Sequence, residues 1–187
     1  ACLLHCNMPM KAIVALGKTP PSLGAKAAGL GDMLALGLAV PPGFVITDPA
    51  GLTAASLAAA VKKLGLKDKP LLLAVRPSVF GPVSGYMEAV LNVGLNDETV
   101  EALALRLNDH ALAHDLYRQF IQNYAVNVLS LRHADFEDIL AAHKGPGLIS
   151  HYKSFIEKQS GAIFPQDLLE QLQGVVAHEM SHIRNFD

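Results

Sequence analysis

Pro70-Leu71-Leu72-Leu73-Ala74-Val75-Arg76-Pro77 is the stretch of sequence that indicates the fold most directly. Its apolar residues form an uninterrupted run between two prolines, which is typical of a short β-strand buried on both faces. Arg76 ends the run, and α/β sheets bind anionic ligands beyond the ends of such strands, where a guanidinium grips phosphate oxygens. The alternative role for Arg76 is a structural ion pair.

The chain before this stretch alternates short apolar runs with helix signals. The predicted strands are residues 13–16 and 44–47, and the predicted helices are residues 22–36 and 53–64. The Ser22 hydroxyl is expected to cap the first of these helices, while Gly37 and Gly65 end them. The first half of the chain is therefore predicted to be an α/β lobe, residues 1–98.

Lys26 lies among small residues near the start of the helix predicted for residues 22–36. Small neighbours let backbone amides approach a ligand, a helix N-terminus favours anions, and a lysine adds a mobile positive charge. Lys26 and Arg76 both follow predicted strands, so they would converge on one phosphate group if those strands shared a sheet. The alternative is a solvated surface lysine on an alanine-rich helix.

The chain after Asn96 shows helical spacing without strand signals. The expected apolar positions are Val100, Leu103 and Leu107, then Leu112, Leu116, Phe120, Tyr124 and Val128. Further helices are predicted over residues 135–143, 148–159 and 166–184. Residues 99–187 are thus expected to form a small all-helical subdomain.

Composition excludes several classes of protein. Of the 187 residues 51% are hydrophobic and 17% are charged, which indicates a folded chain and not a disordered one. The formal net charge of −2 comes from scattered residues, which argues against a nucleic-acid partner. The apolar runs are too short or too interrupted to span a membrane. With two cysteines, Cys2 and Cys6, and no basic leader, a cytoplasmic location is predicted.

His178-Glu179-Met180-Ser181-His182 matches the H-E-x-x-H pattern of zinc metallopeptidases. No third ligand follows in this sequence, and both histidines fall opposite the apolar stripe of their helix. We therefore keep a zinc peptidase as an alternative only and assign no metal. The remaining histidines are scattered, and none is given a role: His110, His114, His133, His143 and His151.

An ordered set of strings resembles the N-terminal nucleotide-binding region of the pyruvate, phosphate dikinases, a group that includes phosphoenolpyruvate synthase. The strings begin with Leu23-Gly24-Ala25-Lys26-Ala27-Ala28-Gly29-Leu30 and Val40-Pro41-Pro42-Gly43-Phe44. They continue with Leu72 to Arg76, Val90-Leu91-Asn92-Val93-Gly94-Leu95-Asn96-Asp97, Tyr117 to Gln122 and Phe164-Pro165-Gln166-Asp167. They run in the family's order over nearly the whole chain from about residue 22.

The resemblance implies one lobe of an ATP-grasp fold with ATP and Mg²⁺ as cofactors. Lys26 and Arg76 would bind ATP phosphates, beneath a loop that contains Gly85, Met87 and Glu88. Arg118 matches a family arginine in the helical part. The family moves the β-phosphoryl group of ATP to a carrier histidine and then to pyruvate, and it consumes inorganic phosphate. Such transfer depends on positioning and on cations that offset charge.

The sequence also departs from the family's pattern. Phe80 replaces a phosphate-binding arginine, and Ala25 and Ala27 replace glycines beside the lysine. The lobe that supplies magnesium ligands, the phosphohistidine domain and the pyruvate-binding barrel do not occur in this sequence. We expect no turnover by the chain alone, and we expect its partners to be nucleotide and the remaining dikinase domains in cis or in trans. A homo-oligomer is compatible with the sequence, and the alternative function is a non-catalytic scaffold that has lost nucleotide affinity.

Overall fold

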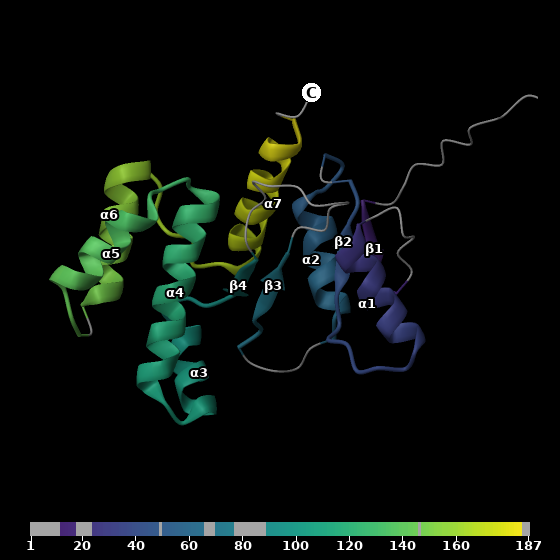
Figure 1. Ribbon diagram of the computed structural model, residues 1–187, viewed down its shortest axis with the longest axis horizontal. Coiled ribbons are helices and arrows are strands. Elements are labelled where there is room, and N and C mark those ends of the chain that lie inside the picture. The colour runs from purple at the N-terminus through teal and green to yellow at the C-terminus, as the bar shows by residue number, and fades with distance from the viewer. Residues whose placement is uncertain are drawn as a thin grey trace, which may run out of the picture. The chain divides into compact units, whose positions relative to one another are not determined.

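The structure, a computed structural model, describes residues 12–17, 24–48, 50–65, 70–76, 89–145 and 147–184, with residues 179–184 described by their backbone alone. Its elements fall into two compact units. The first unit contains β1 (Ile13–Ala15), α1 (Ala25–Ala35), β2 (Phe44–Ile46) and α2 (Ala54–Lys63). The second contains β3 (Leu73–Val75), β4 (Val90–Val93), α3 (Thr99–Leu107), α4 (His110–Val128), α5 (His133–Ala142), α6 (Leu148–Ser160) and α7 (Leu168–Arg184) (Figure 1).

The first unit is a two-stranded antiparallel sheet with two helices. β1 pairs with β2 so that Ile13 lies opposite Ile46, and α2 packs on β1. α1 ends in a Schellman motif, in which Gly37 adopts a positive φ of 74° and donates to the carbonyl of Leu34 at 3.0 Å. α2 begins with a capping box, because the Thr53 and Ser56 side chains each accept from the other's backbone amide.

The sheet of the second unit is a short hairpin-like pair of antiparallel strands, β3 and β4. Its register shifts between Leu73 and Val75, and Asn92 adopts a left-handed backbone with φ 61° there, as in a β-bulge. Gly94 follows with φ 115°. A Cβ atom at Gly94 would collide with the carbonyl oxygen of Leu71, so this turn requires glycine.

The core of the second unit centres on Phe164, which precedes α7. Three aromatic rings of α4 meet it edge to face, with centroid distances of 6.3 Å for Tyr117, 5.7 Å for Phe120 and 5.5 Å for Tyr124. α4 also packs against α3, α6, β4 and α7, so it is the central helix of this unit. A second cluster places Phe136 of α5 against α6.

The helices and the positions of the strands confirm the sequence prediction, whereas the pairing and burial of the strands correct it. Within the run at residues 71–75, the strand β3 covers only Leu73–Val75, and its residues are intermediate or exposed and not buried on both faces. The fold is mostly helical with small antiparallel sheets, so the α/β expectation holds only in part. α1 begins later than predicted, with Gly24 rather than Ser22 at its N-cap position.

The domain boundary after residue 98 stays a prediction. In the structure β4 packs against α4 and α7, so the strands β3 and β4 group with the helices of the second unit.

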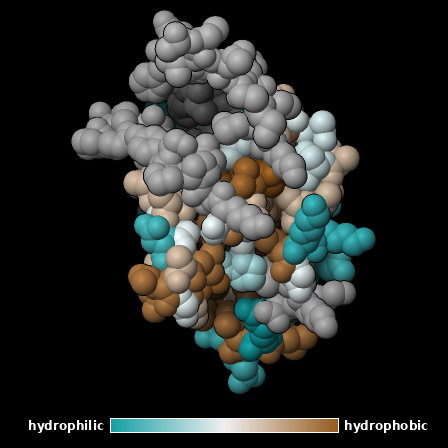
Figure 2. Space-filling model, turned by 90° about the vertical axis from the view of Figure 1, so that its right-hand side faces the viewer, coloured by the Kyte–Doolittle hydropathy of each residue, from teal (hydrophilic) through white to brown (hydrophobic). Residues whose placement is uncertain are grey.

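Hydrophobic side chains reach the surface of the first unit (Figure 2), among them Leu30, Met33 and Leu36 on and after α1. Among the described residues, no helix combines the length and hydropathy needed to cross a bilayer.

Candidate functional site

Lys26 occupies the first turn of α1, where its side chain is exposed to solvent. Gly24, at the N-cap position, has φ 103°, and among the described residues no side chain caps the helix. No acidic residue lies in the first turn. This end of α1 therefore combines a helix N-terminus with a mobile ammonium group, which suits an anion chemically.

Arg76 directly follows β3 and is exposed. The expectation that Lys26 and Arg76 follow strands of one sheet is wrong, because β1 pairs with β2 and β3 pairs with β4 in separate sheets. Strands this short carry too little sequence to specify a partner. The two residues belong to different units. The predicted loop residues Gly85, Met87 and Glu88 lie outside the described residues, as does Phe80.

Arg118 lies on α4 and is held by neighbouring side chains. Its guanidinium pairs with Asp115 at 2.8 Å and donates to the Gln122 side-chain oxygen at 3.0 Å and to the Tyr152 hydroxyl at 3.4 Å. Only 15% of its side chain is exposed. Burial alone would lower the pKa of Arg118, but the contacts with Asp115 and Tyr152 outweigh burial and raise it. None of these contacts involves Arg76.

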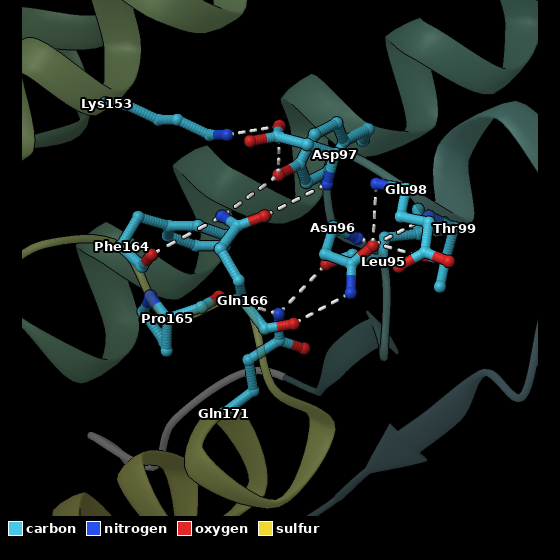
Figure 3. A network of polar contacts seen from close by, with 11 residues as sticks. Leu95, Asn96, Asp97, Glu98, Thr99, Lys153, Phe164, Pro165, Gln166 and Gln171 are labelled. Atoms are coloured by element: carbon cyan, nitrogen blue, oxygen red, sulfur yellow. Dashed lines mark hydrogen bonds and ion pairs between the residues drawn. The ribbon is translucent and has the colours of Figure 1, made fainter.

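A network of polar contacts joins the turn after β4 to the segment before α7 (Figure 3). The Asn96 side chain accepts from the amide of Thr99 at 2.6 Å and donates to the carbonyl of Gln166 at 2.7 Å. The Asp97 amide donates to the Gln166 side-chain oxygen at 3.0 Å. Asn96 thereby pairs an amide at the start of α3 that has no partner within the helix.

Asp97 is also the anchor for two helices. It accepts a hydrogen bond of 3.0 Å from the Tyr117 hydroxyl of α4 and forms an ion pair with Lys153 of α6. The Lys153 ammonium lies 5.2 Å from the centroid of the Tyr117 ring, a cation–π contact. Burial raises the pKa of Tyr117, so its hydroxyl remains a donor. Asp97 therefore connects the turn after β4 to α4 and α6, and its role in this cluster is structural.

Gln171 is a polar side chain buried completely in α7. Its oxygen accepts from the amide of Gly94 at 2.7 Å, and its nitrogen donates to the carbonyls of Leu95 and Pro165, each at 2.9 Å. These three bonds join the turn after β4, the segment before α7 and α7 itself, and Figure 3 shows those to Leu95 and Pro165. A buried amide is stable only when it is paired in this way.

No family model matches the chain. Pyruvate, phosphate dikinase of Rhizobium meliloti (strain 1021) is 34% identical to it over 87% of this chain and 22% of the relative. The chain is related to the pyruvate, phosphate dikinases. The chloroplastic dikinase 1 of Oryza sativa subsp. japonica is 33% identical over 81% of the chain, and the Clostridium symbiosum dikinase is 30% identical over 82%. The chain spans about a fifth of the length of these relatives, 20% to 22%.

The strings that carry the dikinase resemblance meet in the network of Figure 3. Asn96 and Asp97 belong to one string, Tyr117 to a second and Gln166 to a third, and the contacts above join all three. These parts of the dikinase pattern therefore hold elements of the second unit together through their hydrogen bonds. Lys153 and Gln171 belong to none of the strings, and sequence reasoning missed both.

The H-E-x-x-H motif falls at the end of α7. His178 is partly buried, and it is not without an interaction partner. The side chains of Glu179 and His182 lie outside the described residues. The zinc peptidase alternative therefore stays a prediction.

Proposed function

We propose that this chain is the ATP-binding portion of a dikinase-like phosphotransferase, with an ATP-grasp-like lobe that takes ATP together with Mg²⁺. The observation that carries the proposal is the ordered set of strings resembling the nucleotide-binding region of dikinases. Identity of 34% to a curated dikinase over 87% of the chain supports it. The pairing of Mg²⁺ with ATP follows from phosphoryl-transfer chemistry, in which a cation offsets the charge of the phosphate oxygens.

Lys26 is the phosphate ligand that the geometry supports best. Its side chain is exposed in the first turn of α1, where the helix dipole favours an anion, so a phosphate could accept a hydrogen bond from its ammonium group. Ala27 is buried, at 5% exposure, so its methyl group lies on the inner side of the helix. Ala25 is exposed, so of these two substitutions it is the one on the solvent side of the helix.

Arg76 and Arg118 play different parts in the proposal. Arg76 is exposed and could donate two hydrogen bonds to a phosphate. By the dikinase resemblance, Gly85, Met87 and Glu88 would belong to a loop over that phosphate. Arg118 would have to exchange its pair with Asp115 for a phosphate. The whole reaction, with pyruvate, inorganic phosphate and a carrier histidine, would need the remaining dikinase domains in cis or in trans, in the cytoplasm.

Isothermal titration of the chain with MgATP tests the two proposed phosphate ligands. Lys26→Ala and Arg76→Ala should each weaken binding about tenfold or more, because each removes a charge-assisted hydrogen bond. Matched controls remove one positive charge elsewhere: Lys62→Ala at the end of α2 and Arg106→Ala at the end of α3. The controls should bind within about twofold of the parent, since distant surface charges are screened. Equal affinity for Lys26→Ala and the parent would refute the assignment.

The second candidate function is a non-catalytic relative that keeps the fold without nucleotide affinity. The substitutions Phe80 and Ala25 favour it, because one removes a cation and the other adds a methyl group where the family has glycine. If the parent shows no binding heat with MgATP, the double variant Ala25→Gly with Phe80→Arg should create affinity. A variant that still binds nothing would leave no support for a lost nucleotide site.

A further inference from the structure

Three potential metal ligands gather where α3 and α4 lie side by side. Glu101 projects from α3, and His110 and His114 stand one turn apart at the start of α4. Their ligand atoms all lie within 4.8 Å of one another. The His114 Nε2 atom is 2.9 Å from one carboxylate oxygen of Glu101, and the His110 Nδ1 atom is 3.5 Å from the other.

The helix pair holds the backbones of these residues in place. Asn108 ends α3 with a left-handed backbone, and the Asp109 side chain caps α4 by accepting from the amide of Leu112 at 2.9 Å. Leu103 of α3 and Ala113 of α4 are buried, and the two helices pack against each other. The separation of Glu101 from the two histidines is therefore fixed by packed helices, while the side chains themselves remain about half exposed and adjustable.

We propose that Glu101, His110 and His114 bind a Zn²⁺ ion. Zinc takes imidazole nitrogen and carboxylate oxygen at about 2.0–2.2 Å in a tetrahedral arrangement, which places ligand atoms roughly 3.3 Å apart. The two pairs at 2.9 and 3.5 Å already bracket this spacing. Three protein ligands leave a fourth position for water or for a group from a partner.

The chemistry of the donor set selects the ion. Two imidazoles and one carboxylate favour Zn²⁺ over the hard ions Mg²⁺ and Ca²⁺, which prefer oxygen ligands alone. The ion needs an unprotonated nitrogen on each imidazole, so zinc competes with protons and should bind more weakly on acidification. It would also fasten α3 to α4 and stabilise the helical unit.

Equilibrium dialysis of the full chain against micromolar free Zn²⁺ tests the proposal. The H-E-x-x-H motif also offers two histidines one turn apart, so three proteins are compared: the parent, His110→Ala with His114→Ala, and His178→Ala with His182→Ala. We expect bound zinc in the parent and in the second double variant, and its loss from the first. Retention of zinc by the first double variant, or no zinc in the parent, would overturn the proposal.

Two further measurements separate a metal site from a merely structural cluster. Glu101→Gln should weaken zinc binding about tenfold or more while keeping the shape of the side chain. Zinc should raise the unfolding temperature of the parent but not that of the His110→Ala, His114→Ala variant, whose helical circular dichroism confirms that it folds. An equal rise in both would contradict a site at these residues.

Discussion

The turn after β4 shows how single residues determine this fold. Gly94 has a backbone that only glycine adopts easily, and it presses against the carbonyl of Leu71. Its amide donates to Gln171, a side chain 77 positions further along the chain. Gly94, which belongs to a dikinase-like string, is therefore needed because the backbone of Leu71 passes close to it. No pattern in the sequence indicates that the buried Gln171 is its hydrogen-bond partner.

Replacement of Gln171 should destabilise the protein strongly. Gln171→Met keeps the approximate volume but leaves the Gly94 amide and the carbonyls of Leu95 and Pro165 without their partner. We expect the free energy of unfolding to fall by about 2–4 kcal/mol in urea denaturation. Gln159→Met, at an exposed position of α6, is the control and should change it by less than about 0.5 kcal/mol. Similar values for both would show that the buried bonds contribute little.

Tyr124 should make the free energy of unfolding fall as the pH rises above 10. Burial raises its pKa to about 12, above the value of 10.0 for an exposed phenol. The folded state therefore holds this proton more tightly, and the resulting stabilisation is complete below pH 10 and is lost as pH rises towards 12. Between pH 9 and 11.5 the parent should lose up to roughly 2 kcal/mol more than Tyr124→Phe. Parallel pH profiles for the two proteins would contradict this assignment.

At the scale of elements, the positions of the helices could be predicted from the sequence, but which of their residues are buried could be predicted only in part. The predicted helical stretches correspond to α3 to α7, because caps and breaks such as Asp109 and Gly161 act locally. The stripe expected for α4 was partly wrong, since Leu112 is 45% exposed while Ala113 and Ala125 are buried. α4 is covered by neighbours on several sides, and small residues fill its closest contacts.

The packing of α4 against α7 gives a prediction about a glycine. A Cβ atom at Gly174 would overlap the Tyr124 hydroxyl and lie 3.1 Å from its Cζ atom. Overpacking costs about 1–3 kcal/mol, which exceeds the gain of about 1 kcal/mol from alanine in a helix. Gly174→Ala should therefore lower the unfolding temperature.

A double-mutant cycle isolates this contact. In a Tyr124→Phe background the hydroxyl is gone, so Gly174→Ala should cost distinctly less there than in the parent. Gly29→Ala in α1, where a Cβ atom meets nothing within 4 Å, is the matched control and should stabilise the chain or leave it unchanged. Additive effects of the two substitutions would rule out the contact as the cause.

Strand pairing was the part of the fold that the sequence did not reveal. The run at residues 71–75 indicates a strand, but its partner β4 is a separate segment, and the bulge at Asn92 adjusts their register. Such pairings are non-local and depend on contacts that no local pattern encodes. The candidate site was unpredictable for the same reason. Lys26 and Arg76 were expected to converge only if β1 and β3 shared a sheet, and these strands lie in separate sheets.

At the scale of the whole molecule, the candidate phosphate ligands are divided between the two units. The first presents Lys26 at the start of α1, and the second combines Arg76 and Arg118 with the helical core. Sequence patterns supplied the relation to dikinases, whereas the network around Asp97 and the cluster of Glu101 with two histidines needed three-dimensional proximity. Hydrogen bonds of Asp97 join three strings of the dikinase pattern that are far apart in the sequence.

The measurement that tests the central claim most directly is a calorimetric titration of the parent chain with ATP, ADP, AMP and adenosine in the presence of Mg²⁺. Recognition through phosphates by cationic side chains predicts that affinity falls in that order, with adenosine bound most weakly. It also predicts that Lys26→Ala reduces the difference between ATP and AMP. Equal affinity for ATP and adenosine, or no binding of ATP, would contradict the claim that this chain is a nucleotide-binding portion of a dikinase.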